Sequence, residues 1–183
     1  MRDLTEETMN KETIYEGRVF NVELHDVKLP NGETSRREVV KHPGAVAIAP
    51  VTSDNKILLV QQFRKPLEKM IYELPAGKRE AGEEAAVTAR RELEEETGVS
   101  AEALHWVTSF YTSPGFADEL IDIYTAEGLT TGEAHTEEDE FVNVVELSLE
   151  EAEKLVENGG IHDAKTAFVI QYLRLQEMKN RLG

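Results

Sequence analysis

The residues best suited to chemistry are four glutamates in one short stretch, Glu92, Glu94, Glu95 and Glu96. The surrounding sequence predicts a helix over residues 83–97, and side chains three and four positions apart share a face of a helix. Glu92, Glu95 and Glu96 therefore project together, although like charges at this spacing repel one another. Converging carboxylates are the ligands that a hard divalent cation such as Mg²⁺ prefers. An acidic face exposed to solvent would show the same spacing, so the spacing alone leaves both interpretations open.

Glycines and arginines flank these glutamates. Gly77 and Gly82 precede the helix and permit a tight loop that exposes backbone carbonyls and amides. Gly98 directly follows the helix, where a glycine commonly ends it. Arg90 and Arg91 can pair with acids one turn further along. These neighbours favour a site over a plain solvated surface.

The elements that must hold this helix are short strands and two later helices. Alternating apolar residues, with a hairpin signal at Asn31 and Gly32, predict a small antiparallel unit over residues 13–41. Ser148 is expected to cap the first of the later helices. Strands mixed with helices predict an α/β fold in which helices cover both faces of a sheet. The predicted strands are 45–51, 56–63, 70–76, 104–112, 119–128 and 141–147, and the predicted later helices are 148–159 and 163–182.

The overall composition restricts the partners and the location. The 183 residues carry a net charge of −16, which disfavours nonspecific binding to nucleic acid or to an anionic membrane. The chain contains no cysteine, so disulfides and thiolate chemistry are excluded. The polar start lacks the apolar core of a signal peptide, and no apolar run reaches the ~20 residues of a membrane helix. We therefore expect a cytoplasmic protein that partners neither nucleic acid nor a membrane.

The stretch that begins at Gly77 resembles the signature of the Nudix hydrolases. That signature runs from a glycine through a glutamate, an arginine–glutamate pair and a glutamate pair to a final glycine, all at fixed gaps. The resemblance implies an α/β/α sandwich with a mixed sheet, preceded here by the small N-terminal antiparallel β unit. It also implies Mg²⁺- or Mn²⁺-dependent hydrolysis of a nucleoside diphosphate linked to another group. The matching residues are Gly77, Glu83, Arg91, Glu92, Leu93, Glu95, Glu96, Gly98 and Val99.

The same resemblance gives expected roles to individual residues. Glu92 and Glu96 match positions that bind metal ions in the family, and Glu95 matches one that often contributes. Arg91 is expected to orient the cluster through a salt bridge. The backbone carbonyl of Ala76, directly before the first glycine, is expected to be a further metal ligand.

Two further stretches resemble the ADP-ribose pyrophosphatase subfamily. One holds Arg64 in the sequence QQFRKPLEKMIYELPAGK, and the other holds Pro114 at the subfamily's usual spacing after the signature. The resemblance implies hydrolysis of ADP-ribose to AMP and ribose 5-phosphate, with Arg64, Pro114, Gly115 and Phe116 at the substrate. Residues 113–115 could instead form only a strand connection, and Arg64 only a surface salt bridge.

Hydrolysis also needs a group that deprotonates or orients the attacking water. Residues 137–140 form a second acidic cluster in a loop, which could equally be a solvated surface. In the subfamily, an acidic loop at this point closes over the metal ions. On that resemblance, Glu138 is the expected base and Glu140 an expected metal ligand, while a shift of one residue leaves Glu137 and Asp139 open.

The N-terminal unit has a further expected role. Relatives pair through such a segment into a homodimer, which divides the chain into a dimerisation segment (1–43) and a Nudix domain (44–183). Arg36, Arg37 and Glu38 would then reach the substrate, either within their own subunit or across the interface; the alternative is an edge strand whose charges discourage aggregation. Tyr15, Phe20 and Phe116 are candidates for an adenine platform, although each could equally lie in the core.

Two alternative functions remain open at this stage. A Nudix hydrolase could act on another nucleoside diphosphate sugar or on a damaged triphosphate, because the signature does not fix the substrate. A Nudix domain could also serve as a non-catalytic ligand sensor, although every signature glutamate is present here. A calcium-buffering acidic protein is disfavoured by the glycine loop and the arginines.

Overall fold

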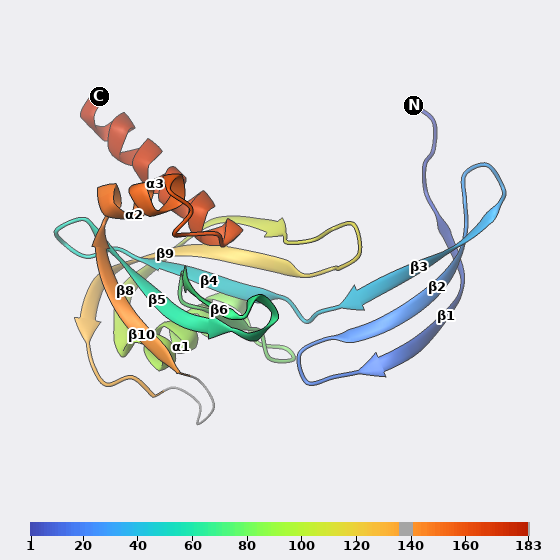
Figure 1. Ribbon diagram of the computed structural model, residues 1–183, viewed down its shortest axis with the longest axis horizontal. Helices are drawn as coiled ribbons and strands as arrows, with labels where there is room; N and C mark the ends of the chain where they lie inside the picture. The colour runs from blue at the N-terminus through green and yellow to red at the C-terminus, as the bar shows by residue number, and fades with distance from the viewer. Residues whose placement is uncertain (136–140, 183) are drawn as a thin grey trace.

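The computed structural model describes residues 1–135 and 141–182, and its N-terminal part is a separate antiparallel sheet (Figure 1). Gly32, with a φ of 87°, donates its N–H to the carbonyl of Leu29 at 2.8 Å and so closes the expected hairpin. The sheet begins earlier than the predicted residue 13 and has a third strand. Its strands are β1 (Glu7–Glu16), β2 (Asn21–Lys28) and β3 (Thr34–Lys41), in the order β1-β2-β3.

Two further sheets form the centre of the molecule. In the larger one, β4 and β9 are parallel and the other neighbours are antiparallel, so the sheet is mixed as expected. Its order is β7 (Ala76–Lys78), β4 (Ala45–Pro50), β9 (Leu120–Thr131) and β8 (Val99–Tyr111). The smaller sheet is antiparallel, in the order β10 (Val142–Ser148), β5 (Lys56–Arg64) and β6 (Lys69–Glu73), with the short 3₁₀ helix η1 (Lys65–Leu67) between the last two.

In the described part of the chain, three α-helices cover the two faces of these sheets: α1 (Ala85–Thr97) on one, and α2 (Leu149–Glu157) with α3 (Ala164–Leu182) on the other (Figure 1). Every residue of β4 is buried. Successive side chains of a strand point to opposite faces of the sheet, and helices cover both faces here. Val46 and Ile48 pack with Ala89 and Leu93 of α1, whereas the alanines of β4 belong to the core that includes α2 and α3. The α/β/α sandwich is therefore confirmed.

Local signals fixed the ends of two helices as expected. Gly98 has a φ of 67° and donates its N–H to the carbonyl of Glu94 at 2.9 Å, which ends α1. Ser148 and Glu151 form a reciprocal capping box at the start of α2. Among the described residues, no helix is both long and apolar enough to cross a membrane.

One predicted strand, 70–76, is wrong. The chain leaves the smaller sheet after Glu73 and joins the larger sheet at Ala76, so two strands in different sheets replace one. Pro75 has no N–H to donate, and its carbonyl accepts from the N–H of Ile48 at 2.8 Å. The prediction of 104–112 is too short, because β8 already begins at Val99. Residues 73–78, here called the seam segment, connect the two sheets.

Candidate active site

Two carboxylates of α1 lie against the backbone of the seam segment. The N–H of Ala76 donates to Oε2 of Glu96 at 2.9 Å, and Glu96 is only 4% exposed. The carboxylate of Glu92 occupies the space that a β-carbon on Gly77 would need, since such an atom would lie 1.9–2.1 Å from it. A residue without a β-carbon at position 77 therefore lets the helix approach the strand this closely.

Arg91 joins three carboxylates. Its Nη1 donates to Oε1 of Glu92 at 2.8 Å and to Oε2 of Glu95 at 2.9 Å. Its Nη2 and Nε donate to the two carboxylate oxygens of Glu83 at 3.2 and 3.3 Å. The pKa of Arg91 is raised, first by its hydrogen bonds to Glu83. One cation thus holds three anions, which leaves this Arg91 cluster (Arg91, Glu83, Glu92 and Glu95) with excess negative charge.

Glu83 reaches this cluster from the loop before α1. Thr88, fully buried on the first turns of α1, donates its hydroxyl to Oε2 of Glu83 at 2.8 Å. The hydrogen bonds from Arg91, and then the one from Thr88, lower the pKa of Glu83 to about 2. Glu83 is therefore ionised and held in place at neutral pH.

The ligands available here are all oxygens, which suits Mg²⁺ or Mn²⁺. Glu92, Glu96 and the carbonyl of Ala76 come from two adjacent elements, and the approach at Gly77 brings them together. Within residues 1–135 and 141–182, no group of three histidine, aspartate or glutamate side chains is arranged to hold a metal ion. Mg²⁺ commonly uses only one or two protein carboxylates and completes its shell with water and substrate phosphates, so this set fits it. Glu138 and Glu140 lie outside the described residues.

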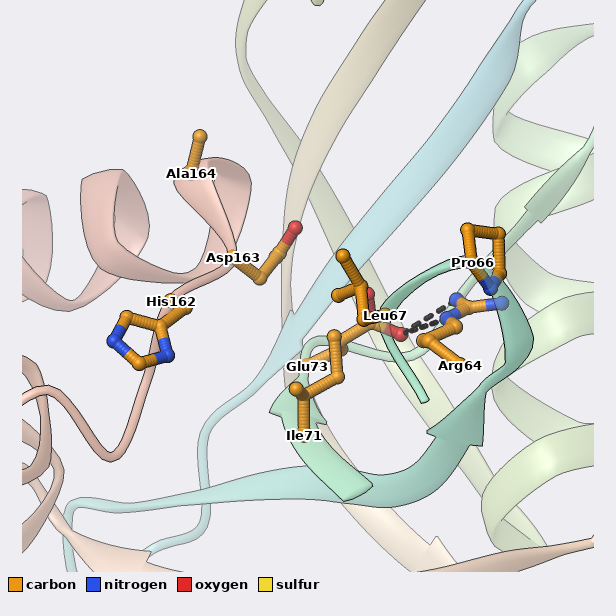
Figure 2. A pocket seen from close by; sticks show the side chains of 8 residues that line it. All are labelled: Arg64, Pro66, Leu67, Ile71, Glu73, His162, Asp163 and Ala164. Atoms are coloured by element: carbon orange, nitrogen blue, oxygen red, sulfur yellow. Dashed lines mark hydrogen bonds and ion pairs between the residues drawn. The ribbon is translucent and has the colours of Figure 1, made fainter. Parts of the chain in front are cut away.

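Arg64 lies at a second group of charges, in a pocket of about 300 Å³ between η1 and the start of α3 (Figure 2). Its Nε and Nη2 contact Oε2 of the buried Glu73 at 2.8 and 2.5 Å. Lys165 contacts the other oxygen of Glu73 at 3.3 Å and Asp163 at 3.0 Å. These four residues are here called the Glu73 cluster. Arg64 is thus a fixed residue at a pocket and not a free surface side chain.

The predicted substrate residues after β8 lie in the turn between β8 and β9. Phe116 is 58% exposed, and its carbonyl accepts from the N–H of Val40 in β3 at 2.8 Å. A β-carbon on Gly115 would meet no atom within 4 Å, so the neighbouring Pro114–Gly115 turn faces open space. This turn is therefore one place where the N-terminal sheet contacts the rest of the molecule.

In the single chain, the candidates on the N-terminal sheet contact other residues of the N-terminal segment. Arg37 pairs with Glu6 at 2.6 and 2.9 Å, and Glu38 lies opposite Leu24 in the pairing of β3 with β2. The rings of Tyr15 and Phe20 lie 5.9 Å apart and both are exposed, so neither belongs to the core. The expectation that Arg37 and Glu38 reach the substrate stays a prediction.

Sequence reasoning missed Thr88, which supports the Arg91 cluster, and both Glu73 and Lys165 of the Glu73 cluster. Thr88 falls in an unspecified part of the signature, and no pattern marked it. Glu73 carried a usable signal, because it is the one acid in the apolar run MIYELPA. A charged residue in a predicted buried strand requires a partner, and that partner is rarely identifiable before the fold is known.

Comparison with known proteins adds independent findings. Residues 40–167 match the model of the NUDIX domain, and residues 6–40 match that of the nucleoside diphosphate sugar hydrolase N-terminal domain. The ADP-ribose pyrophosphatase of Bacillus subtilis (strain 168) is 56% identical over 179 residues, covering 97% of both chains. The methanol dehydrogenase activator of Bacillus methanolicus is 55% identical over 174 residues, covering 94% of both chains.

A solved structure supports the fold. The crystal structure of an ADP compounds hydrolase has a TM-score of 0.84 at 24% sequence identity, covering 99% of this chain and 98% of that one. This match includes the N-terminal sheet as well as the central sandwich, since almost the whole chain is covered.

Proposed function

The chain belongs to the NUDIX domain family, and from that premise we propose that it is an ADP-ribose pyrophosphatase, which hydrolyses ADP-ribose to AMP and ribose 5-phosphate. The observation that carries the proposal is the 56% identity, over 97% of both chains, with a protein of that name. The approach of Glu92 and Glu96 to the seam segment supports it, because it supplies an anionic site where a diphosphate and its cations can meet.

We propose specific roles for the residues of this site. Glu92, Glu96 and the Ala76 carbonyl would hold Mg²⁺, or Mn²⁺ in its place. When bound, such a cation neutralises diphosphate charge and polarises phosphorus. Arg91 keeps the carboxylates of Glu92 and Glu95 in fixed orientations through the hydrogen bonds described above.

The substrate and the water need further groups. Arg64 offers N–H groups that suit a phosphate oxygen. The turn residues Pro114, Gly115 and Phe116, with Arg37 and Glu38, are proposed to contact the rest of the substrate. The loop residues Glu138, as the base, and Glu140, as a further metal ligand, remain predictions from the sequence.

The deciding experiment identifies the products of ADP-ribose with Mg²⁺ present and after its removal by a chelator. AMP and ribose 5-phosphate, formed only with the divalent cation, are expected. Other nucleoside diphosphate sugars are assayed in parallel, and faster turnover of one of them would replace the proposed substrate. Binding of ADP-ribose without turnover of any of these compounds would instead indicate a ligand sensor.

We also propose a cytoplasmic homodimer built through an N-terminal segment, residues 1–43, attached to a catalytic domain, residues 44–183. All ten residues of β1 are exposed in the single chain, and they include the apolar Ile14 and Tyr15. Phe20, which follows β1, is also exposed. A three-stranded sheet with so much apolar exposure gains stability by packing on a second copy. Light scattering should give twice 20.6 kDa, and a monomer at micromolar concentration would contradict the proposal.

A second candidate function is the activation of a dehydrogenase. It is favoured by the relative that is 55% identical over 94% of both chains and is named a methanol dehydrogenase activator. The test adds the wild-type chain, or Glu92→Gln, to a purified methanol dehydrogenase. A faster dehydrogenase with the wild-type chain only would assign activation to the hydrolytic site.

A further inference from the structure

Glu73 is a buried carboxylate that the reaction described above does not use. It lies at the end of β6 with 4% exposure, three residues before Ala76. Its partners come from elements far apart in the sequence: Arg64 at the end of β5 and Lys165 in the first turn of α3. Burying a carboxylate costs free energy unless charged partners and hydrogen bonds compensate it, so this arrangement requires an explanation.

The two oxygens of Glu73 are divided between the two cations. Oε2 accepts from Nε of Arg64 at 2.8 Å and contacts Nη2 at 2.5 Å, while Oε1 faces Nζ of Lys165 at 3.3 Å. An arginine has five N–H groups, so binding one oxygen through two nitrogens leaves others available. In Figure 2 the third nitrogen of the guanidinium points away from Glu73, beside Pro66.

The charges around Arg64 also balance. Lys165 contacts both Glu73 and Asp163, so Arg64 and Lys165 together offset the two carboxylates. Lys165 is nearly buried at 12% side-chain exposure, whereas the side chain of Arg64 is 41% exposed. The buried pair therefore fixes one side of the guanidinium, and its other side stays open to the pocket.

We propose that Glu73, held by Lys165, is a positioning residue that fixes the guanidinium of Arg64 for a phosphate group of the substrate. The inference rests on the proposed function, because it takes Arg64 as a substrate-binding group. A long flexible side chain loses conformational freedom when it binds a ligand, and fixing it beforehand removes that cost. Glu73 thus acts on substrate affinity through Arg64 and touches no reacting atom.

The first test measures KM and kcat for ADP-ribose in Glu73→Gln, with and without Arg64→Ala. Glu73→Gln should raise KM about 3- to 10-fold with little change in kcat, as the lost preorganisation implies. In the Arg64→Ala background the same change should have almost no effect on KM. An equal rise in both backgrounds, or no rise in either, would overturn the proposal.

Two further variants separate positioning from general loss of stability. Ser148→Ala removes the capping box at the start of α2 and touches no residue of the Glu73 cluster. It should lower the melting temperature while KM stays within about twofold of wild type. If Glu73→Gln does not fold, the charge-balanced double variant Glu73→Gln/Lys165→Met takes its place in the cycle.

A readout independent of activity separates this inference from the proposed function. The Nε–H of Arg64 should give an NMR signal protected from solvent exchange in the substrate-free protein, because it donates to a buried carboxylate. Glu73→Gln should remove that protection and Ser148→Ala should keep it; protection in all three proteins would overturn the positioning role. A wild-type protein that does not hydrolyse ADP-ribose would overturn the proposed function, and the NMR signal would still decide whether Glu73 fixes Arg64.

Discussion

The Arg91 cluster and the Glu73 cluster use the same kinds of side chain in opposite proportions. In the first, the single Arg91 forms ion pairs with Glu83, Glu92 and Glu95, so negative charge is in excess. In the second, Arg64 and Lys165 balance Glu73 and Asp163, and the buried carboxylate receives both cations. Both clusters contact the seam segment, the first through Lys78 and the second through Glu73 itself.

The difference indicates what each cluster can bind. Excess carboxylates at close range repel one another, and a divalent cation relieves that repulsion. A balanced cluster has no such demand, and it can hold a guanidinium whose remaining N–H groups face an anion. The seam segment therefore contacts one group suited to a cation and one suited to an anion, as the proposed metal-dependent reaction on a diphosphate requires.

The largest effect is expected where the excess charge is removed. Glu92→Gln and Glu96→Gln keep the size of the side chain but lose the charge that a hard cation requires, so each should lower kcat by about 10²-fold or more. Glu94→Gln on the same helix is the matched control, since Glu94 is exposed and takes no part in the cluster. Near-wild-type kcat in both variants at saturating Mg²⁺ would remove the distinction between the clusters.

A smaller effect is expected from the backbone at the Arg91 cluster. In Gly77→Ala the new β-carbon would lie about 2 Å from the Glu92 carboxylate, so that side chain must move. The Mg²⁺ concentration for half-maximal activity should rise about 10- to 100-fold, as for other losses of ligand support. Calorimetric titration with Mg²⁺ checks this directly, and unchanged affinity would show that the close approach is not needed for the cation.

Thr88 tests whether the cluster depends on its buried support. Thr88→Val keeps the shape and removes the hydroxyl that donates to Glu83, which should cost about 1.5–3 kcal/mol of unfolding free energy. Thr88→Ser retains the hydroxyl and should recover most of the Mg²⁺ response that Thr88→Val loses. Urea unfolding and Mg²⁺ titration compare the two variants. An equal unfolding free energy and an equal Mg²⁺ response in both would show that the hydroxyl does not support the cluster.

The features that were predictable from the sequence are those decided by neighbours in the chain. The α1 glutamates, the glycine that ends α1 and the Ser148 cap follow from spacings of a few residues. The break at Pro75 was missed because apolar residues continue across it, although the strands on either side pair with different partners.

The partners of the Glu73 cluster were not predictable for a related reason. Glu73 and Lys165 are 92 residues apart, and only the packing of α3 against β6 brings them together. Sequence spacing carries no information about such a contact in a single chain. The roles of Glu138 and Glu140 remain predictions, since both lie outside the described residues.

The smallest expected effect is on the pH dependence of the unfolding free energy. It tests whether Arg91 stabilises the charged form of Glu83. Hydrogen bonds from Arg91 and Thr88 lower the pKa of Glu83 from 4.5 to about 2 in the folded protein. A lowered pKa means that the unfolded chain binds the proton more tightly. The stabilisation is therefore complete above about pH 5 and is lost as the pH falls through 4.5 toward 2.

Glu83→Gln removes this titration, so the unfolding free energy of the variant should fall less steeply than that of wild type between pH 5 and 2. Urea unfolding without divalent cations, at several pH values in that range, measures both slopes. Glu150→Gln is the control, because the pKa of Glu150 is also lowered, by Lys154, but at an exposed pair away from the cluster. Parallel curves for wild type and Glu83→Gln would mean that Arg91 does not hold Glu83 in its charged form. Only Glu92 and Glu95 would then count against Arg91, so the excess of negative charge would fall from two to one and the contrast with the Glu73 cluster would be weaker by one charge.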